Sequence, residues 1–92
     1  MIVLVTYTCR PGKAAEFVNA IRAEGLQEVI RQEAGCLQYD YHQSLENPDV
    51  VLLLERWDSS RAQERHMTQP HMSRISALKA EYVELSKVEK YQ

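Results

Sequence analysis

The fold of this chain is decided by the stretch Val50-Val51-Leu52-Leu53-Leu54-Glu55-Arg56-Trp57. Its branched and aromatic residues are typical of a β-strand. Alternate residues of a strand point to opposite faces of the sheet, and here Val51 and Leu53 alternate with Val50 and Leu52. Both faces of this strand are therefore apolar, which indicates that each face of the sheet is covered by another layer.

Two more strands are predicted on the N-terminal side of this stretch. Residues 36–45 alternate between aromatic or apolar and polar side chains, and residues 46–49 (Glu-Asn-Pro-Asp) are typical of a turn. Together with Val50–Trp57 they predict an antiparallel hairpin. The stretch Ile2–Cys9 is rich in Val, Ile, Thr and Tyr and is apolar on both faces at its start, so it predicts the first strand.

A helix is predicted between the first two strands. Apolar residues recur at helical spacing over residues 14–33. Gly25 interrupts this run and is expected to mark a bend, since glycine costs about 1 kcal/mol in a helix interior. Gly35 lies where a helix C-cap is expected.

The remaining segment predicts two short helices and a last strand. Residues 58–60 offer N-caps for a helix to about residue 68, and Pro70 suits the first turn of a helix with an apolar stripe. Weak alternation over residues 85–91 predicts the final strand. Merging the two short helices gives a single domain over residues 1–92 with a split βαβ, ferredoxin-like α+β fold and an antiparallel four-stranded sheet.

The helices can cover only one face of such a sheet. A second copy of the chain is the simplest cover for the other face, because two identical sheets can pack face to face as a C2 homodimer. An uncovered face rich in Val and Leu would favour aggregation. The pattern therefore predicts a homodimer.

Composition excludes several classes of partner. The 92 residues hold 11 Lys and Arg against 13 Asp and Glu, a net charge of −2, which argues against nucleic acid. No stretch approaches the roughly 18 apolar residues of a membrane helix. The apolar residues 1–5 are too few for a signal peptide, and Cys9 and Cys36 have no metal-binding spacing. We expect a cytoplasmic protein with reduced thiols.

An ordered set of short motifs runs over nearly the whole chain. The motifs are Pro11-Gly12-Lys13 with Phe17, Glu33-Ala34-Gly35-Cys36-Leu37-x-Tyr39, Glu46-Asn47-Pro48-Asp49, Leu54-Glu55-x-Trp57, and His66 with Pro70-His71. In this order and spacing they resemble the antibiotic biosynthesis monooxygenase domain family. The resemblance implies a dimeric α+β barrel, which agrees with the fold reached from the pattern. It also implies several activities, among them cofactor-free oxidation of polyphenols, haem degradation and isomerisation, between which the fold cannot choose.

His66 and Glu55 are the candidate catalytic residues. His66 matches the recurring histidine of the family, and an imidazole can take a proton from a phenolic hydroxyl or donate one. Glu55 and Trp57 are two apart on one strand and share a face, so Glu55 would orient His66 if that face looks toward the helices. The alternative is that His66 is satisfied by Glu55 or a backbone carbonyl, purely for packing.

Trp57, Tyr39 and His71 are the candidate substrate-binding residues. Trp57 resembles a pocket tryptophan of several family monooxygenases, but it could equally close the barrel end with its N–H bonded. Tyr39 could belong to the core or the dimer interface, and His71 could cap a helix. His66 and His71 are five apart across Pro70 and form no regular metal motif, so we expect no metal site, and no nucleotide fingerprint indicates a cofactor.

The leading hypothesis is a cofactor-free monooxygenase that oxidises a small hydroquinone or polyphenol with O2. His66 would remove a phenolic proton, and the substrate itself would then reduce O2. The alternatives are an isomerase or proton-transfer enzyme acting on a small carbonyl compound, and a non-catalytic dimeric ligand-binding module. In a non-catalytic module, the side chains of Phe17, Ile21 and Tyr82 would fill the space between the sheet and the helices. Haem degradation is less expected, because Ile2–Cys9 lacks the asparagine that the haem-degrading branch has there.

Overall fold

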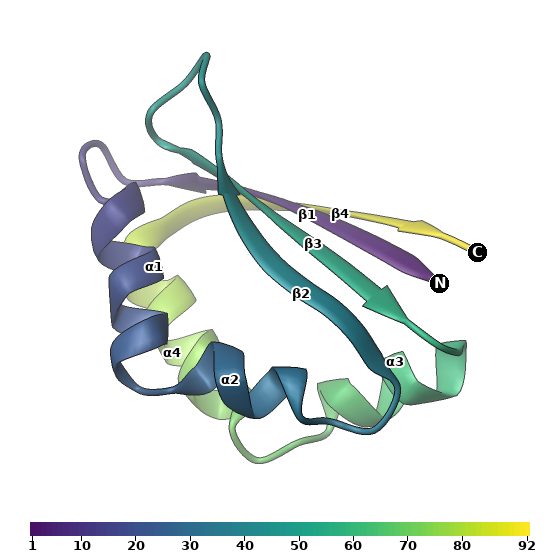
Figure 1. Ribbon diagram of the computed structural model, residues 1–92. Coiled ribbons are helices and arrows are strands. Elements are labelled where there is room, and N and C mark those ends of the chain that lie inside the picture. The colour runs from purple at the N-terminus through teal and green to yellow at the C-terminus, as the bar shows by residue number, and fades with distance from the viewer.

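The computed structural model describes residues 1–92 as four strands and four helices (Figure 1). In chain order these are β1 (Ile2–Cys9), α1 (Ala14–Ala23), α2 (Leu26–Arg31), β2 (Cys36–Gln43), β3 (Val50–Trp57), α3 (Ser60–Met67), α4 (Met72–Tyr82) and β4 (Val83–Tyr91). The predicted bounds of the first and third strands are confirmed. The last strand begins two residues earlier than predicted and follows α4 directly.

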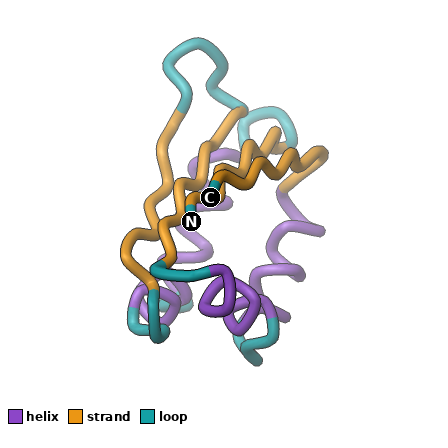
Figure 2. Tube along the Cα trace, turned by 90° about the vertical axis from the view of Figure 1, so that its right-hand side faces the viewer, coloured by secondary structure: helices purple, strands orange, loops and turns teal.

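The strands form one sheet in the order β2-β3-β1-β4, with every neighbouring pair antiparallel. All four helices lie on the same side of this sheet, as the two perpendicular views show (Figures 1 and 2). The predicted α+β, ferredoxin-like fold is therefore confirmed. No helix is long and apolar enough to cross a membrane.

The predicted helix over residues 14–33 is two helices, which is a correction. Gly25 separates them with a φ of +69°, a left-handed conformation that glycine adopts at least cost. The second helix, α2, ends at Arg31, so Gly35 is not its C-cap. Gly35 instead belongs to the turn that leads into β2, with a φ of +84°.

Gly35 lets this turn press against the start of α3. A Cβ atom at this position would lie 2.5 Å from Asp58 Oδ1 and 2.6 Å from Ala62 Cβ, closer than van der Waals contact allows. The backbone N–H of Asp58 also donates to the Gly35 carbonyl over 2.9 Å. The close approach of this turn to α3 therefore requires glycine at position 35, and it fixes the residues just before Gly35 relative to α3.

A bulge interrupts the alternation predicted for the second strand. Cys36 pairs with Trp57 and Gln38 pairs with Arg56, so Leu37 is an extra residue on β2. Leu37 is 57% exposed and does not share the inward face with Tyr39, contrary to the simple alternation. Beyond the bulge, Tyr39 lies opposite Glu55 and is buried.

The core lies between the sheet and the helices. The side chains of Val5, Tyr7 and Leu53 point into it from the sheet, and Phe17 and Ile21 enter it from α1 and are fully buried. Each buried apolar side chain contributes about 1.5–3 kcal/mol relative to exposure. The opposite face of the sheet carries no layer of this chain.

Candidate active site

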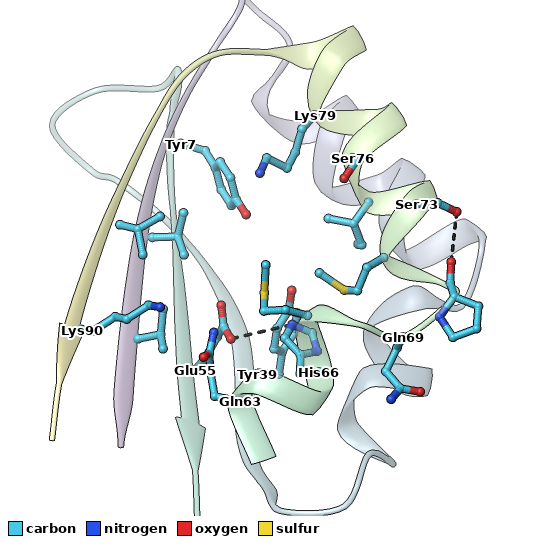
Figure 3. Close-up of a pocket in the computed structure, with 17 residues that line it drawn as sticks. Tyr7, Tyr39, Glu55, Gln63, His66, Gln69, Ser73, Ser76, Lys79 and Lys90 are labelled. Carbon is cyan, nitrogen blue, oxygen red and sulfur yellow. Dashed lines mark hydrogen bonds and ion pairs between the residues drawn. The ribbon is translucent and has the colours of Figure 1, made fainter. Parts of the chain in front are cut away.

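A cavity of about 930 Å³ lies between the inner face of the sheet and helices α3 and α4 (Figure 3). This volume is in the range of cavities that hold small organic ligands. Much of its wall is apolar and is formed by Val3, Val5, Met67, Met72, Ile75 and Val88.

The cavity is not lined by Phe17, Ile21 and Tyr82. Phe17 packs instead against the rings of Tyr7 and Tyr82, at 5.3 and 6.2 Å between ring centroids.

His66 reaches the cavity wall from α3, whose first turn is capped by the Ser59 hydroxyl accepting from the Ala62 N–H over 3.1 Å. The imidazole is only 1% exposed. Its ring centroid is 4.7 Å from that of Trp57 and 5.7 Å from that of Tyr39. These aromatic contacts hold the ring in one orientation.

Glu33 is the hydrogen-bond partner of His66. The Nδ1 atom of His66 lies 3.1 and 3.0 Å from the two carboxylate oxygens of Glu33. Because a carboxylate can only accept, Nδ1 carries the proton, and in the neutral ring Nε2 is left with a free lone pair. Glu33, and not Glu55, therefore makes the hydrogen bond to the His66 ring.

Glu55 lies on the other side of the imidazole, with Oε1 4.0 Å from Nε2 of His66 (Figure 3). The same oxygen accepts the indole N–H of Trp57 over 2.9 Å. Burial raises the pKa of Glu55 above that of an ordinary glutamate. The Trp57 hydrogen bond and the charges of His66 and Lys90 only partly offset this effect. Glu55 therefore holds a proton more readily than an exposed glutamate.

Trp57 lies behind His66 and Glu55 and is not on the cavity wall. It is 1% exposed, and its N–H is satisfied by Glu55. Its contacts are those of a residue that supports two cavity side chains. Tyr39, in contrast, is on the wall, and burial raises the pKa of its hydroxyl well above the usual value, so the hydroxyl stays protonated at neutral pH.

His71 lies off the cavity wall, with Nε2 2.7 Å from Oε2 of Glu33. Glu33, His66 and His71 are the residues that could hold a metal ion, since their donor atoms lie within 4.8 Å of one another. Ligands at about 2.1 Å from a tetrahedral metal are roughly 3.4 Å apart. The observed contacts of 2.7 and 3.0 Å are instead typical of hydrogen bonds. The structure thus describes a carboxylate shared by two imidazoles.

Sequence spacing concealed this cluster. Glu33 and His66 are 33 positions apart, and no local pattern in the sequence links them. The signal that could have identified it is its place two residues before Gly35, the glycine that brings the turn against α3.

The fold and the site define a small α+β protein with a ligand-sized cavity and, on the cavity wall, a histidine whose ring is held by a carboxylate outside the wall. A family model described as antibiotic biosynthesis monooxygenase matches residues 1–78, and the chain belongs to this family. No curated protein sequence matches the chain significantly.

Several solved structures are similar over nearly the full length. A protein from Pseudomonas aeruginosa is 33% identical, with 99% of this chain and 91% of that chain covered and a TM-score of 0.84. A conserved protein from Methanosarcina mazei is 28% identical, with 99% and 89% covered and a TM-score of 0.87. A structure described as an antibiotic biosynthesis monooxygenase is 23% identical, with 100% and 97% covered and a TM-score of 0.83, a likeness of fold.

Proposed function

We propose that this protein is a monooxygenase that oxidises a small hydroquinone or polyphenol with O2 and no cofactor. The observation that carries the proposal is the position of His66 on the wall of a largely apolar cavity, with Nδ1 bonded to Glu33 and with Nε2 in no hydrogen bond. Membership of the antibiotic biosynthesis monooxygenase family supports this class of reaction.

His66 acts as the general base. Its Nε2 takes the proton of a phenolic hydroxyl, while Glu33 holds the ring and stabilises the imidazolium that forms. The resulting anion is electron-rich and passes electrons to O2. One oxygen atom enters the substrate and the other leaves as water, so the substrate loses two pairs of electrons and no external reductant is needed.

The surroundings of His66 suit this chemistry. The apolar wall keeps water from a reactive oxygen intermediate. Glu55, whose pKa is raised by burial, is a second group that can hold a proton beside Nε2. Tyr39 contributes a protonated hydroxyl and an aromatic surface next to the imidazole.

We also propose that the protein acts as a homodimer in which the open sheet faces of two copies pack together. Leu4, Leu52 and Leu54 lie on this face and are half-buried in the single chain. Burying a contiguous apolar face of this kind favours association.

The experiment that tests the proposed function is O2 consumption over a panel of hydroquinones and polyphenols. We expect uptake above the autoxidation rate with the parent chain and a loss of about 100-fold or more with His66→Ala. Asn19→Ala is the control, because Asn19 is exposed on α1 and neither lines the cavity nor lies on the sheet, and its rate should equal that of the parent.

Two outcomes would contradict the proposal in different ways. Uptake at the autoxidation rate for every compound would argue against an oxygenase and favour proton transfer or ligand binding. Uptake retained by His66→Ala would leave the oxygenase and remove His66 from its mechanism.

A further inference from the structure

The wall of the cavity is not uniform in charge. At one end His66 faces Glu55, and Lys90 of β4 lies near enough to lower the pKa of Glu55. At the other end lies Lys79 of α4, whose side chain extends toward the ring of Tyr7 (Figure 3). The two ends therefore differ, because only the first contains a carboxylate.

Lys79 has no ionic partner in the chain. The ion pairs involve other residues, and Lys79 donates no hydrogen bond to another group. Its ammonium lies 5.8 Å from the centroid of the Tyr7 ring, and the residue as a whole is half-buried. A cation that is partly removed from water gains by pairing with an anion.

Two hydroxyl groups accompany Lys79 on the wall. Ser76 is three residues earlier on α4 and so lies on the same helix face. The Tyr7 hydroxyl points into the cavity, and it stays protonated because burial raises its pKa (Figure 3). All three groups can donate a hydrogen bond. The carboxylate that lines the same cavity, Glu55, is near enough for its charge to contribute to the raised pKa of Tyr7, but it forms no ion pair with Lys79.

We propose that Lys79, Tyr7 and Ser76 form an anion-binding subsite that takes the acidic group of a small aromatic acid. The ring of this ligand packs on Val5, Val88 and Ile75, which line the same cavity. We assign the ligand further as a hydroquinone that carries a carboxylate and places its hydroxyl at His66, and this assignment rests on the proposed function. The anion-binding subsite itself does not depend on the proposed function.

The subsite is tested by two dyes that share one skeleton. 8-Anilinonaphthalene-1-sulfonate carries an acidic group, whereas N-phenyl-1-naphthylamine is the same aromatic system without it. Dye fluorescence is titrated with the parent chain, with Lys79→Gln, and with Lys13→Gln as control, since Lys13 is an exposed lysine that does not line the cavity.

We expect Lys79→Gln to weaken binding of the anionic dye at least fivefold and binding of the neutral dye less than twofold. Lys13→Gln should change neither, and Lys79→Arg should retain most of the affinity for the anionic dye. Added salt should weaken the binding of the anionic dye and leave the binding of the neutral dye unchanged. An equal effect of Lys79→Gln on both dyes, or no effect on either, would overturn the proposal.

Displacement of the anionic dye identifies the acidic group. 2,5-Dihydroxybenzoate should displace it at a concentration at least fivefold lower than hydroquinone does, and Lys79→Gln should abolish this difference. Phenyl phosphate is tested in the same displacement assay. If it displaces the dye at a lower concentration than 2,5-dihydroxybenzoate does, the subsite is assigned to phosphate esters and not to carboxylates. Displacement by the acids no better than by hydroquinone would overturn the subsite.

The dye measurements report binding and do not depend on O2 consumption. They therefore test the anion-binding subsite separately from the proposed oxygenase activity. Selective displacement by 2,5-dihydroxybenzoate without O2 uptake would support the subsite and contradict the oxygenase. If the acid is oxidised, Lys79→Gln should raise its KM at least fivefold and leave the KM of hydroquinone unchanged. O2 uptake from hydroquinone combined with dye binding that is insensitive to Lys79→Gln would overturn the subsite alone.

Discussion

At the scale of single residues, the position of one proton determines what His66 can do. Glu33 accepts from Nδ1, and this contact leaves Nε2 free to receive a proton on the cavity side. Nε2 of His71 donates to the same carboxylate over 2.7 Å. Glu33 is therefore a positioning residue that acts through His66 and does not line the cavity.

The raised pKa of Glu55 predicts a pH-dependent stability. Burial raises the pKa of Glu55 in the folded chain, so the folded state binds this proton more tightly than the unfolded state, whose glutamate pKa is about 4.3. The corresponding stability is fully present below about pH 4 and is lost as the pH rises through the folded pKa. Glu55→Gln removes this titration and should make the chain more stable than the parent at pH 7.

Urea unfolding at pH 4 and pH 7 measures this effect. The stability difference between Glu55→Gln and the parent should grow between these two pH values, by about 1.4 kcal/mol for each unit by which the pKa is raised. Glu84→Gln, at an exposed position on β4, is the control and should show no such change. A difference that is the same at both pH values would contradict the buried titration.

At the scale of elements, the turn between α2 and β2 holds the site together. It carries Glu33 and is brought against α3 by Gly35, while α3 carries His66. The geometry of the histidine–carboxylate pair thus depends on the approach of two elements that are distant in the chain.

Gly35→Ala should therefore destabilise the chain more than an alanine at another left-handed glycine. Both Gly35 and Gly12 have positive φ, which costs about 1–2 kcal/mol for other residues. Only at Gly35 would the new Cβ overlap Asp58 and Ala62, whereas no atom lies within 4 Å of a Cβ at Gly12. We expect a loss of about 3 kcal/mol or more for Gly35→Ala and about 1 kcal/mol for Gly12→Ala, measured by urea unfolding. Equal losses would show that the contact with α3 is not tight.

At the scale of the whole molecule, two adjacent leucines of β3 face different layers. Leu53 is 1% exposed and belongs to the core under the helices. Leu52 lies on the open face, where Thr6 of β1 is its antiparallel partner. An aspartate at each position therefore tests a different layer.

Leu53→Asp should abolish folding, because it buries a charge without a partner. Leu52→Asp should leave a folded chain and convert a dimer into a monomer, because its side chain lies on the face proposed for association. Sedimentation at micromolar concentration together with circular dichroism separates these outcomes. A parent chain that sediments as a 10.7 kDa monomer would contradict the homodimer.

The local pattern of the sequence was sufficient for the strands, the hairpin and the placing of Glu55 and Trp57 on one face of the sheet, but it left open which face looks toward the helices. These follow from the period of two along a strand, which requires only near neighbours in the chain. The same reasoning predicted only a bend at Gly25, where the helix in fact breaks, and it missed the extra residue at Leu37, because a bulge does not alter the apolar pattern around it.

The sequence by itself thus determined the fold class, the family resemblance and His66 as a candidate. Only the tertiary structure decided that Glu33 is the partner of His66 and that Trp57 lies behind the cavity wall. It also decided that Lys79 faces the cavity without an ionic partner. The physical reason is that these features depend on how separate elements pack, and a hydrogen bond across 33 positions leaves no periodic trace in the chain.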